Sequence, residues 1–232
     1  FTGGNNVVIG KLAGYNLTSA SANVIIGEDA GLEQTTADNN ILIGQGAGEN
    51  LTTGDQNIFV GTAAGDGHDA ERNNIGIGKA ALGGSINGGE YNVVIGNLAG
   101  DSITTGDNNT LIGHEAGGAL SASNSNTFVG YHAGVGAASG CHTNTAMGYL
   151  AGEELSTGDN NLLLGANAGD PQSPGGQIDS DDNKIVLGNH DIAEFNCQVS
   201  LTVASDKRDK TDVEPVVIGL DYVNKLKPVT YR

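Results

Sequence analysis

The stretch NNVVIGKLAG, residues 5–14, is the first of ten closely similar segments in this chain. In every copy an asparagine precedes three mostly apolar residues and a closing glycine, and an Ala-Gly pair follows in all copies but the one that reads Ala81-Leu82. Most closing glycines are 17 residues apart, and two intervals are 18. They are Gly10, Gly27, Gly44, Gly61, Gly78, Gly96, Gly113, Gly130, Gly148 and Gly165. Such strict periodicity indicates a repeat protein.

Seventeen residues are too few for a helical hairpin but suit one coil of a β-solenoid, with a short strand at each β-rich triplet. We therefore predict an all-β fold, a parallel β-solenoid of about ten coils over residues 1–169. Coils about 4.8 Å apart would make it roughly 48 Å long. Side chains alternate between the two faces of a strand, so the first and third residues of a triplet share a face. We expect this pair to line the inside of the coil.

The middle residue of each triplet then points outward, where a polar residue would be expected. The column it forms is instead apolar: Val8, Ile25, Leu42, Phe59, Gly76, Val94, Leu111, Phe128, Ala146 and Leu163. An exposed apolar column of this length predicts an interface with other chains. The alternative is that a loop of the same chain covers the column.

The asparagine that precedes each triplet predicts a structural ladder, because aligned amides can form hydrogen bonds along a parallel stack. Contact with a ligand is the alternative. The acidic turns LTTGD (51–55), ITTGD (103–107) and LSTGD (155–159) raise the possibility of calcium binding. They lack the glycine-rich nonapeptide of calcium-bound β-rolls, which favours ordinary turn chemistry.

Three consecutive coils carry an aromatic ring directly after the closing glycine: His114, Tyr131 and Tyr149. Stacked rings could form a sugar-binding platform, and the alternative is an aromatic ladder that only stabilises the stack. The five histidines do not show the spacing of a metal site. We predict no metal and no cofactor.

Composition excludes several classes of protein. The 232 residues have a formal net charge of −17, which argues against nucleic acid and against attraction to anionic membranes. No apolar run is long enough for a transmembrane helix, and no signal peptide is recognisable. The chain begins at Phe1, so we expect a processed or excised piece. Two distant cysteines, Cys141 and Cys197, argue against a disulfide framework.

The repeat ends after Gly169, and residues 170–204 are predicted to hold a loop, a distorted final coil and a capping strand. NKIVLG (183–188) repeats the triplet motif with one extra residue. In FNCQVSLTV (195–203) apolar and polar residues alternate, which predicts a half-buried strand with Cys197 as a core thiol. Residues 205–232 predict the start of another domain, with a helix that begins near Pro215.

Two family resemblances rest on these segments. The repeated motif NNVVIG…AG of residues 1–169 resembles the head repeats of YadA-like trimeric adhesins, although the period here is longer. ASDKRDKTDVEPVVIGLDYVNKLKPVTYR (204–232) resembles the opening of the endosialidase-type intramolecular chaperone, the self-cleaving C-terminal domain of bacteriophage tailspikes and tail fibres. The resemblance implies a homotrimer.

The chaperone resemblance also implies self-cleavage at the Ser205–Asp206 bond, with Ser205 as nucleophile and Lys210 as base. Asp206 and Arg208 match further motif positions, whereas Asp209 stands where the family usually has an apolar residue. Since most of the domain lies beyond residue 232, we expect this piece not to cut itself. We expect no activity on an external substrate.

Together these observations predict a homotrimeric fibre segment of a phage tail fibre or tailspike, a virion component that attaches to a host-surface glycan or protein. The alternative is the head of a bacterial trimeric adhesin at the cell surface. An enzyme is less favoured because the acidic residues are scattered in turns and do not converge as a carboxylate pair. An ice-binding monomer would need a regular threonine array, which too few coils provide.

Overall fold

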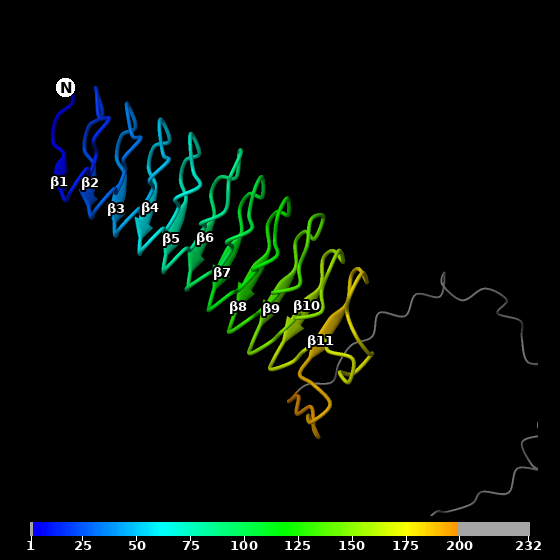
Figure 1. Ribbon diagram of the computed structural model, residues 1–232. Coiled ribbons are helices and arrows are strands. Elements are labelled where there is room, and N and C mark those ends of the chain that lie inside the picture. The colour runs from blue at the N-terminus through cyan, green and yellow to red at the C-terminus, as the bar shows by residue number, and fades with distance from the viewer. Residues whose placement is uncertain (1, 199–232) are drawn as a thin grey trace, which may run out of the picture. The chain divides into compact units, whose positions relative to one another are not determined.

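The computed structural model describes residues 2–198, and the chain divides into one unit that ends at Ala193 and another that begins at Glu194. Residues 2–193 form a parallel β-solenoid in which eleven strands stack in chain order (Figure 1). No helix occurs among residues 2–198. The predicted fold class, an all-β parallel solenoid with coils of about 17 residues, is confirmed.

Every strand is three residues long and coincides with one apolar triplet of the repeat. The strands are β1 (Val7–Ile9), β2 (Val24–Ile26), β3 (Ile41–Ile43), β4 (Ile58–Val60), β5 (Ile75–Ile77), β6 (Val93–Ile95), β7 (Thr110–Ile112), β8 (Thr127–Val129), β9 (Thr145–Met147), β10 (Leu162–Leu164) and β11 (Ile185–Leu187). Consecutive strands pair in register, so Ile25 lies beside Leu42 and Leu42 beside Phe59. The two 18-residue intervals keep this register, because their extra residue lies outside the strands.

The predicted direction of the strand side chains is wrong. The middle residue points into the coil and is fully buried within a single chain, whereas the first and third residues point outward. The buried middle residues are Ile25, Leu42, Phe59, Val94, Leu111, Phe128, Ala146 and Leu163. Val8 is 42% exposed because it belongs to the first coil of the stack. The middle column is therefore core rather than interface, and the chain's own coil covers it.

A narrow interior explains this orientation. The middle side chain packs directly on the Ala-Gly corner across the coil, and a Cβ on Gly134 would lie 2.4 Å from the ring of Phe128. One large side chain per strand therefore fills the space. In the coil that lacks Ala-Gly the large and small residues are exchanged. Its middle residue is Gly76, and the buried Leu82 occupies the position of the corner glycine.

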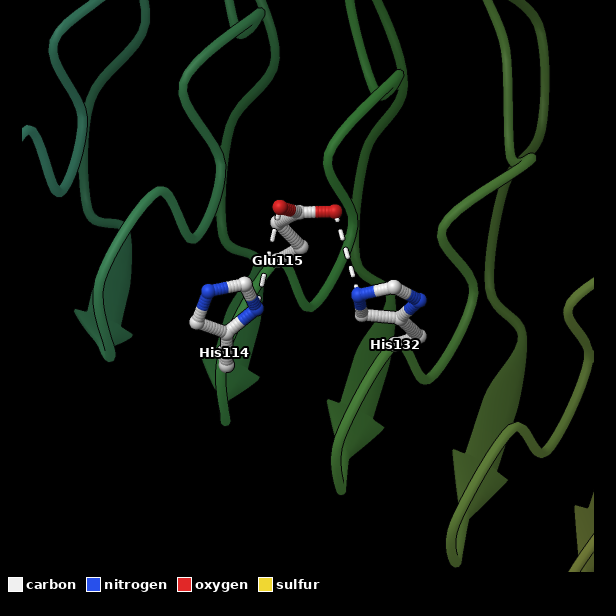
Figure 2. Close-up of side chains that lie close together, drawn as sticks. All are labelled: His114, Glu115 and His132. Atoms are coloured by element: carbon white, nitrogen blue, oxygen red, sulfur yellow. Dashed lines mark ion pairs between the residues drawn. The ribbon is translucent and has the colours of Figure 1, made fainter.

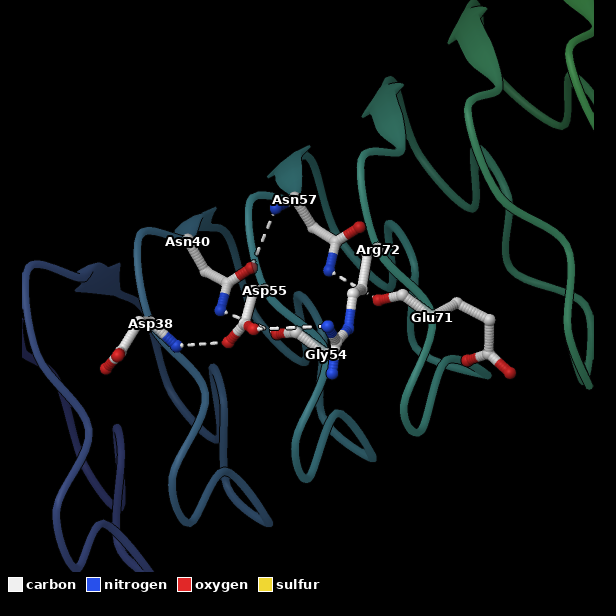
Figure 3. Close-up of polar contacts among 7 residues, drawn as sticks. All are labelled: Asp38, Asn40, Gly54, Asp55, Asn57, Glu71 and Arg72. Carbon is white, nitrogen blue, oxygen red and sulfur yellow. Dashed lines mark hydrogen bonds and ion pairs between the residues drawn. The ribbon is translucent and has the colours of Figure 1, made fainter.

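The predicted asparagine ladder is confirmed, and the backbone takes part in it. The side-chain oxygen of Asn40 accepts a hydrogen bond from the backbone N–H of Asn57 at 2.8 Å, and its Nδ2 donates to the carbonyl of Gly54 at 2.9 Å (Figure 3). The pattern continues from coil to coil as far as the N–H of Lys184, which donates to Asn161. Each buried asparagine thus satisfies backbone groups of the next coil that would otherwise be unpaired.

The acidic turns form a second ladder between coils, which the sequence did not predict. Asp55 accepts a hydrogen bond from the backbone N–H of Asp38 at 2.8 Å, which Figure 3 also shows. Asp107 and Asp159 accept from the preceding coil in the same way. These carboxylates therefore hold neighbouring coils together.

The predicted final coil is present, and β11 pairs in register with β10 after an insertion that contains the buried Ile178. The predicted strand at 195–203 is wrong in its described part, because residues 195–198 are not a strand and Phe195 is 61% exposed. Residues 199–203 and the expected helix near Pro215 lie outside the described residues.

Candidate functional site

The three rings that follow the closing glycines stack along one edge of the solenoid. His114 and Tyr131 are stacked with centroids 5.5 Å apart, and Tyr131 and Tyr149 follow at 5.4 Å. Tyr131 and Tyr149 are 45% and 55% exposed, although their rings stack on each other. The aromatic ladder is therefore formed, and its contact with a glycan stays a prediction.

A fourth ring, His132, joins this ladder and was not singled out from the sequence. Its ring lies parallel to that of Tyr131, with centroids 4.0 Å apart, and it also stacks on His114 at 5.7 Å. The coil-to-coil hydrogen bond from the backbone N–H of His132 to the carbonyl of His114 holds the two residues at this separation.

Glu115 lies between the two histidines (Figure 2). One carboxylate oxygen is 3.7 Å from Nδ1 of His114 and the other is 3.1 Å from Nε2 of His132. One potential ligand atom from each residue lies within 4.8 Å of those of the other two. The spacing of the histidines along the sequence did not indicate this cluster, which residues of two neighbouring coils form. In a solenoid the relevant spacing is one coil, and His114 and His132 are one coil apart.

The two cysteines and the predicted cleavage residues are considered separately from this cluster. Cys141 is the buried thiol, and burial raises its pKa to about 12, so it is not a nucleophile at neutral pH. The prediction that Cys197 is a core thiol is wrong, since it is exposed. Ser205, Asp206 and Lys210 lie outside the described residues.

His68 is a buried titratable group away from the cluster. It occupies the core column of Leu51 and Ile86, and its ring packs on Phe59 with centroids 4.5 Å apart. Neither ring nitrogen has a hydrogen-bond partner within the described part of the chain. Burial lowers the pKa of His68 from 6.5 to about 3, so it is neutral in the folded protein.

We expect His68→Leu to stabilise the protein by about 1–3 kcal/mol at pH 7, because it removes buried polar atoms without partners. The variant should also be less sensitive to acid. The folded-state pKa of His68 is depressed, so its neutral form contributes full stability above about pH 6.5 and loses it as the pH falls toward 3, about 2 kcal/mol by pH 5. Urea unfolding at both pH values measures the difference. The exposed His190→Gln control should behave as wild type, and equal acid sensitivity of His68→Leu and wild type would contradict the prediction.

The outward residues of the strands form a continuous apolar surface, which we call the outer strand face. It consists of the first and third residues of each triplet: Val7, Ile9, Val24, Ile26, Ile41, Ile43, Ile58, Val60, Ile75, Ile77, Val93, Ile95, Thr110, Ile112, Thr127, Val129, Thr145, Met147, Leu162, Leu164, Ile185 and Leu187. Three threonines are its polar members, and none of the 27 acidic and 10 basic residues of the chain belongs to it. Ile77, Ile95 and Ile112 are each 37% exposed.

Within residues 2–198, no helix has the length and apolar character needed to span a membrane. Comparisons with protein-family models, curated proteins and solved structures found no match to this chain.

Proposed function

We propose that this chain is a structural segment of a homotrimeric fibre, in which three solenoids pack through the outer strand face. The observation that carries the proposal is the absence of any charged residue from that face in a chain of net charge −17. Eleven coils about 4.8 Å apart make the face roughly 48 Å long, and its two side-chain columns make it about 12 Å wide. The resulting ~600 Å² reaches the upper limit for apolar patches on monomers.

Three copies are favoured over two because both families that the sequence resembles are trimeric. The charged surface elsewhere on each solenoid repels other copies, which leaves the outer strand face as the favourable contact. Identical coils can pair one step out of register, so a fibre of this kind needs a device that aligns its chains. The segment at 204–232, with its resemblance to a self-cleaving chaperone, would supply that alignment.

In this proposal the chain belongs to a tail fibre or tailspike of a bacteriophage. Its role is to extend the fibre and to attach it to the host surface. The ladder of His114, Tyr131 and Tyr149 is the surface that we propose for contact with a glycan, because both of its tyrosines stay exposed in the stack. The head of a bacterial trimeric adhesin is the second candidate, because the repeated sequence motif resembles the repeats of such heads. Both roles require the same assembly.

The assembly is tested with a triple variant, Ile77→Glu, Ile95→Glu and Ile112→Glu. A lone solenoid should tolerate these substitutions, because the three side chains are partly exposed in a single chain. A trimer should not, because like charges would be buried against one another. We expect light scattering to show the mass of one chain, while circular dichroism still shows β structure.

The matched control places three glutamates at exposed positions off this face, Gln45→Glu, Thr62→Glu and Ala166→Glu. It adds the same charge and should keep the mass of three chains. If the triple variant on the outer strand face also kept that mass, the proposal would be wrong.

A further inference from the structure

We propose that His114, Glu115 and His132 form a binding site for a divalent transition-metal ion of the Zn²⁺ type. Nδ1 of His114 lies 3.7 Å from one oxygen of Glu115, and Nε2 of His132 lies 3.1 Å from the other. Zinc bonds of about 2.0–2.2 Å separate neighbouring ligand atoms by about 3.3–3.4 Å in a tetrahedral site. The two observed distances bracket this value, and the three candidate ligand atoms lie within 4.8 Å of one another.

His132 and Glu115 lie close together without forming a hydrogen bond. Nε2 of His132 is buried, yet it has no partner with acceptable hydrogen-bond geometry among the described residues, although a Glu115 oxygen is only 3.1 Å away. This imidazole nitrogen is thus buried beside a carboxylate without a hydrogen-bond partner, which leaves it available to bind an ion.

The backbone holds the three residues in place before any ion arrives. Glu115 and His132 occupy the same corner position in consecutive coils, with φ of 53° at both. Their backbone N–H groups donate to the preceding coil, Glu115 to Asn97 and His132 to His114, both at 3.0 Å. The ring of Tyr131 lies against His132 and limits its rotation. Such preorganisation reduces the entropy that binding an ion would cost.

The ligand types select the class of metal. Imidazole nitrogens suit Zn²⁺, Ni²⁺, Cu²⁺ and Co²⁺, whereas Ca²⁺ and Mg²⁺ prefer all-oxygen sites. Three protein ligands leave a fourth position that is open to water or to a group from another molecule. His114 is exposed and belongs to the aromatic ladder, so the open coordination position is accessible from the edge of the solenoid that carries this ladder.

Titration calorimetry with Zn²⁺ alone tests the site on the full 232-residue chain. The protein carries Cys197→Ser, since that exposed thiol could bind zinc, and it is purified without a polyhistidine tag and treated with chelator. We expect saturable binding of one ion per chain at neutral pH, and a visible cobalt spectrum typical of nitrogen and oxygen ligands when Co²⁺ replaces Zn²⁺.

Two variants identify the ligands. Glu115→Gln keeps the side-chain shape, and His132→Asn introduces the residue found at the same corner as Asn167. Each should weaken zinc binding at least about tenfold, while circular dichroism and mass remain those of wild type. His190→Gln is the matched control, because His190 pairs with Asp191 at 3.3 Å without a second imidazole, and it should bind zinc as wild type does. Absence of one-to-one binding by the parent chain, or binding of wild-type strength by both ligand variants, would overturn the proposal.

Discussion

Replacing Gly113 with alanine is expected to destabilise the solenoid by at least about 3 kcal/mol, through backbone strain and a direct clash. Gly113 has φ of 139°, a conformation that L residues rarely adopt. A Cβ added there would lie 2.1 Å from the carbonyl oxygen of Gly130 in the next coil. In-register stacking thus explains why every repeat closes with glycine. Thermal or urea unfolding measures the loss.

Two further glycines separate the causes of this effect. Gly88 has φ of 113° but no atom within 4 Å of an added Cβ, so Gly88→Ala tests strain alone. Gly118 lacks the positive φ, and its added Cβ would lie 3.3 Å from the nearest atom. We expect the stability loss to be largest for Gly113→Ala, intermediate for Gly88→Ala and smallest for Gly118→Ala. A loss for Gly113→Ala no greater than that for Gly118→Ala would show that neighbouring coils are not stacked this closely.

Phe128→Ala is the second substitution with a large expected effect, a loss of about 3–5 kcal/mol in the free energy of unfolding. Phe128 is fully buried in a single chain and packs on the Gly134 corner, so truncation leaves a cavity in a narrow core. The mass of the assembly should not change, because this side chain does not reach the surface. Unfolding by urea and light scattering on the same sample measure both quantities.

The neighbouring Val129 provides the control for Phe128. It lies in the same strand but points outward, and it is half-buried in a single chain. Val129→Ala should cost the single-chain fold much less, since it opens no cavity inside the coil. If Phe128→Ala instead reduced the mass and left the fold as stable as wild type, the middle residue would face a partner chain and the observed orientation would be wrong.

The repeat, the strand positions and the asparagine ladder could be predicted because they follow from a fixed period and from residue chemistry. The direction of the strand side chains could not, because most triplets are apolar at all three residues and alternation then carries no information. One signal was present in the sequence. The coil with glycine as its middle residue, Gly76, is the one with leucine in place of the corner glycine, Leu82. This exchange of volume is understandable only if the two positions meet inside the coil.

The histidine cluster was missed for a related reason. Metal ligands on a helix or a tight turn are a few residues apart, whereas His114 and His132 are separated by a full coil. Positions one period apart are neighbours in space, so candidate sites in a solenoid are found by comparing columns of the repeat. The aromatic column of His114, Tyr131 and Tyr149 is found in this way, and the neighbouring column holds Glu115 and His132.

Because the middle residues are buried inside the coil, only the outward residues of the strands can contact other chains, and they form an apolar surface. The outer strand face runs through all eleven strands to β11, whereas the predicted interface column ends at Leu163. It also contains two residues per coil in place of one. The proposed trimer therefore rests on a larger surface than the sequence alone indicated.

The mass of the unmodified chain in solution tests this proposal most directly. Light scattering on the full 232-residue chain should give about 70 kDa, three times the 23.4 kDa of one chain. A stable species of 23.4 kDa, with the outer strand face in contact with water, would contradict it.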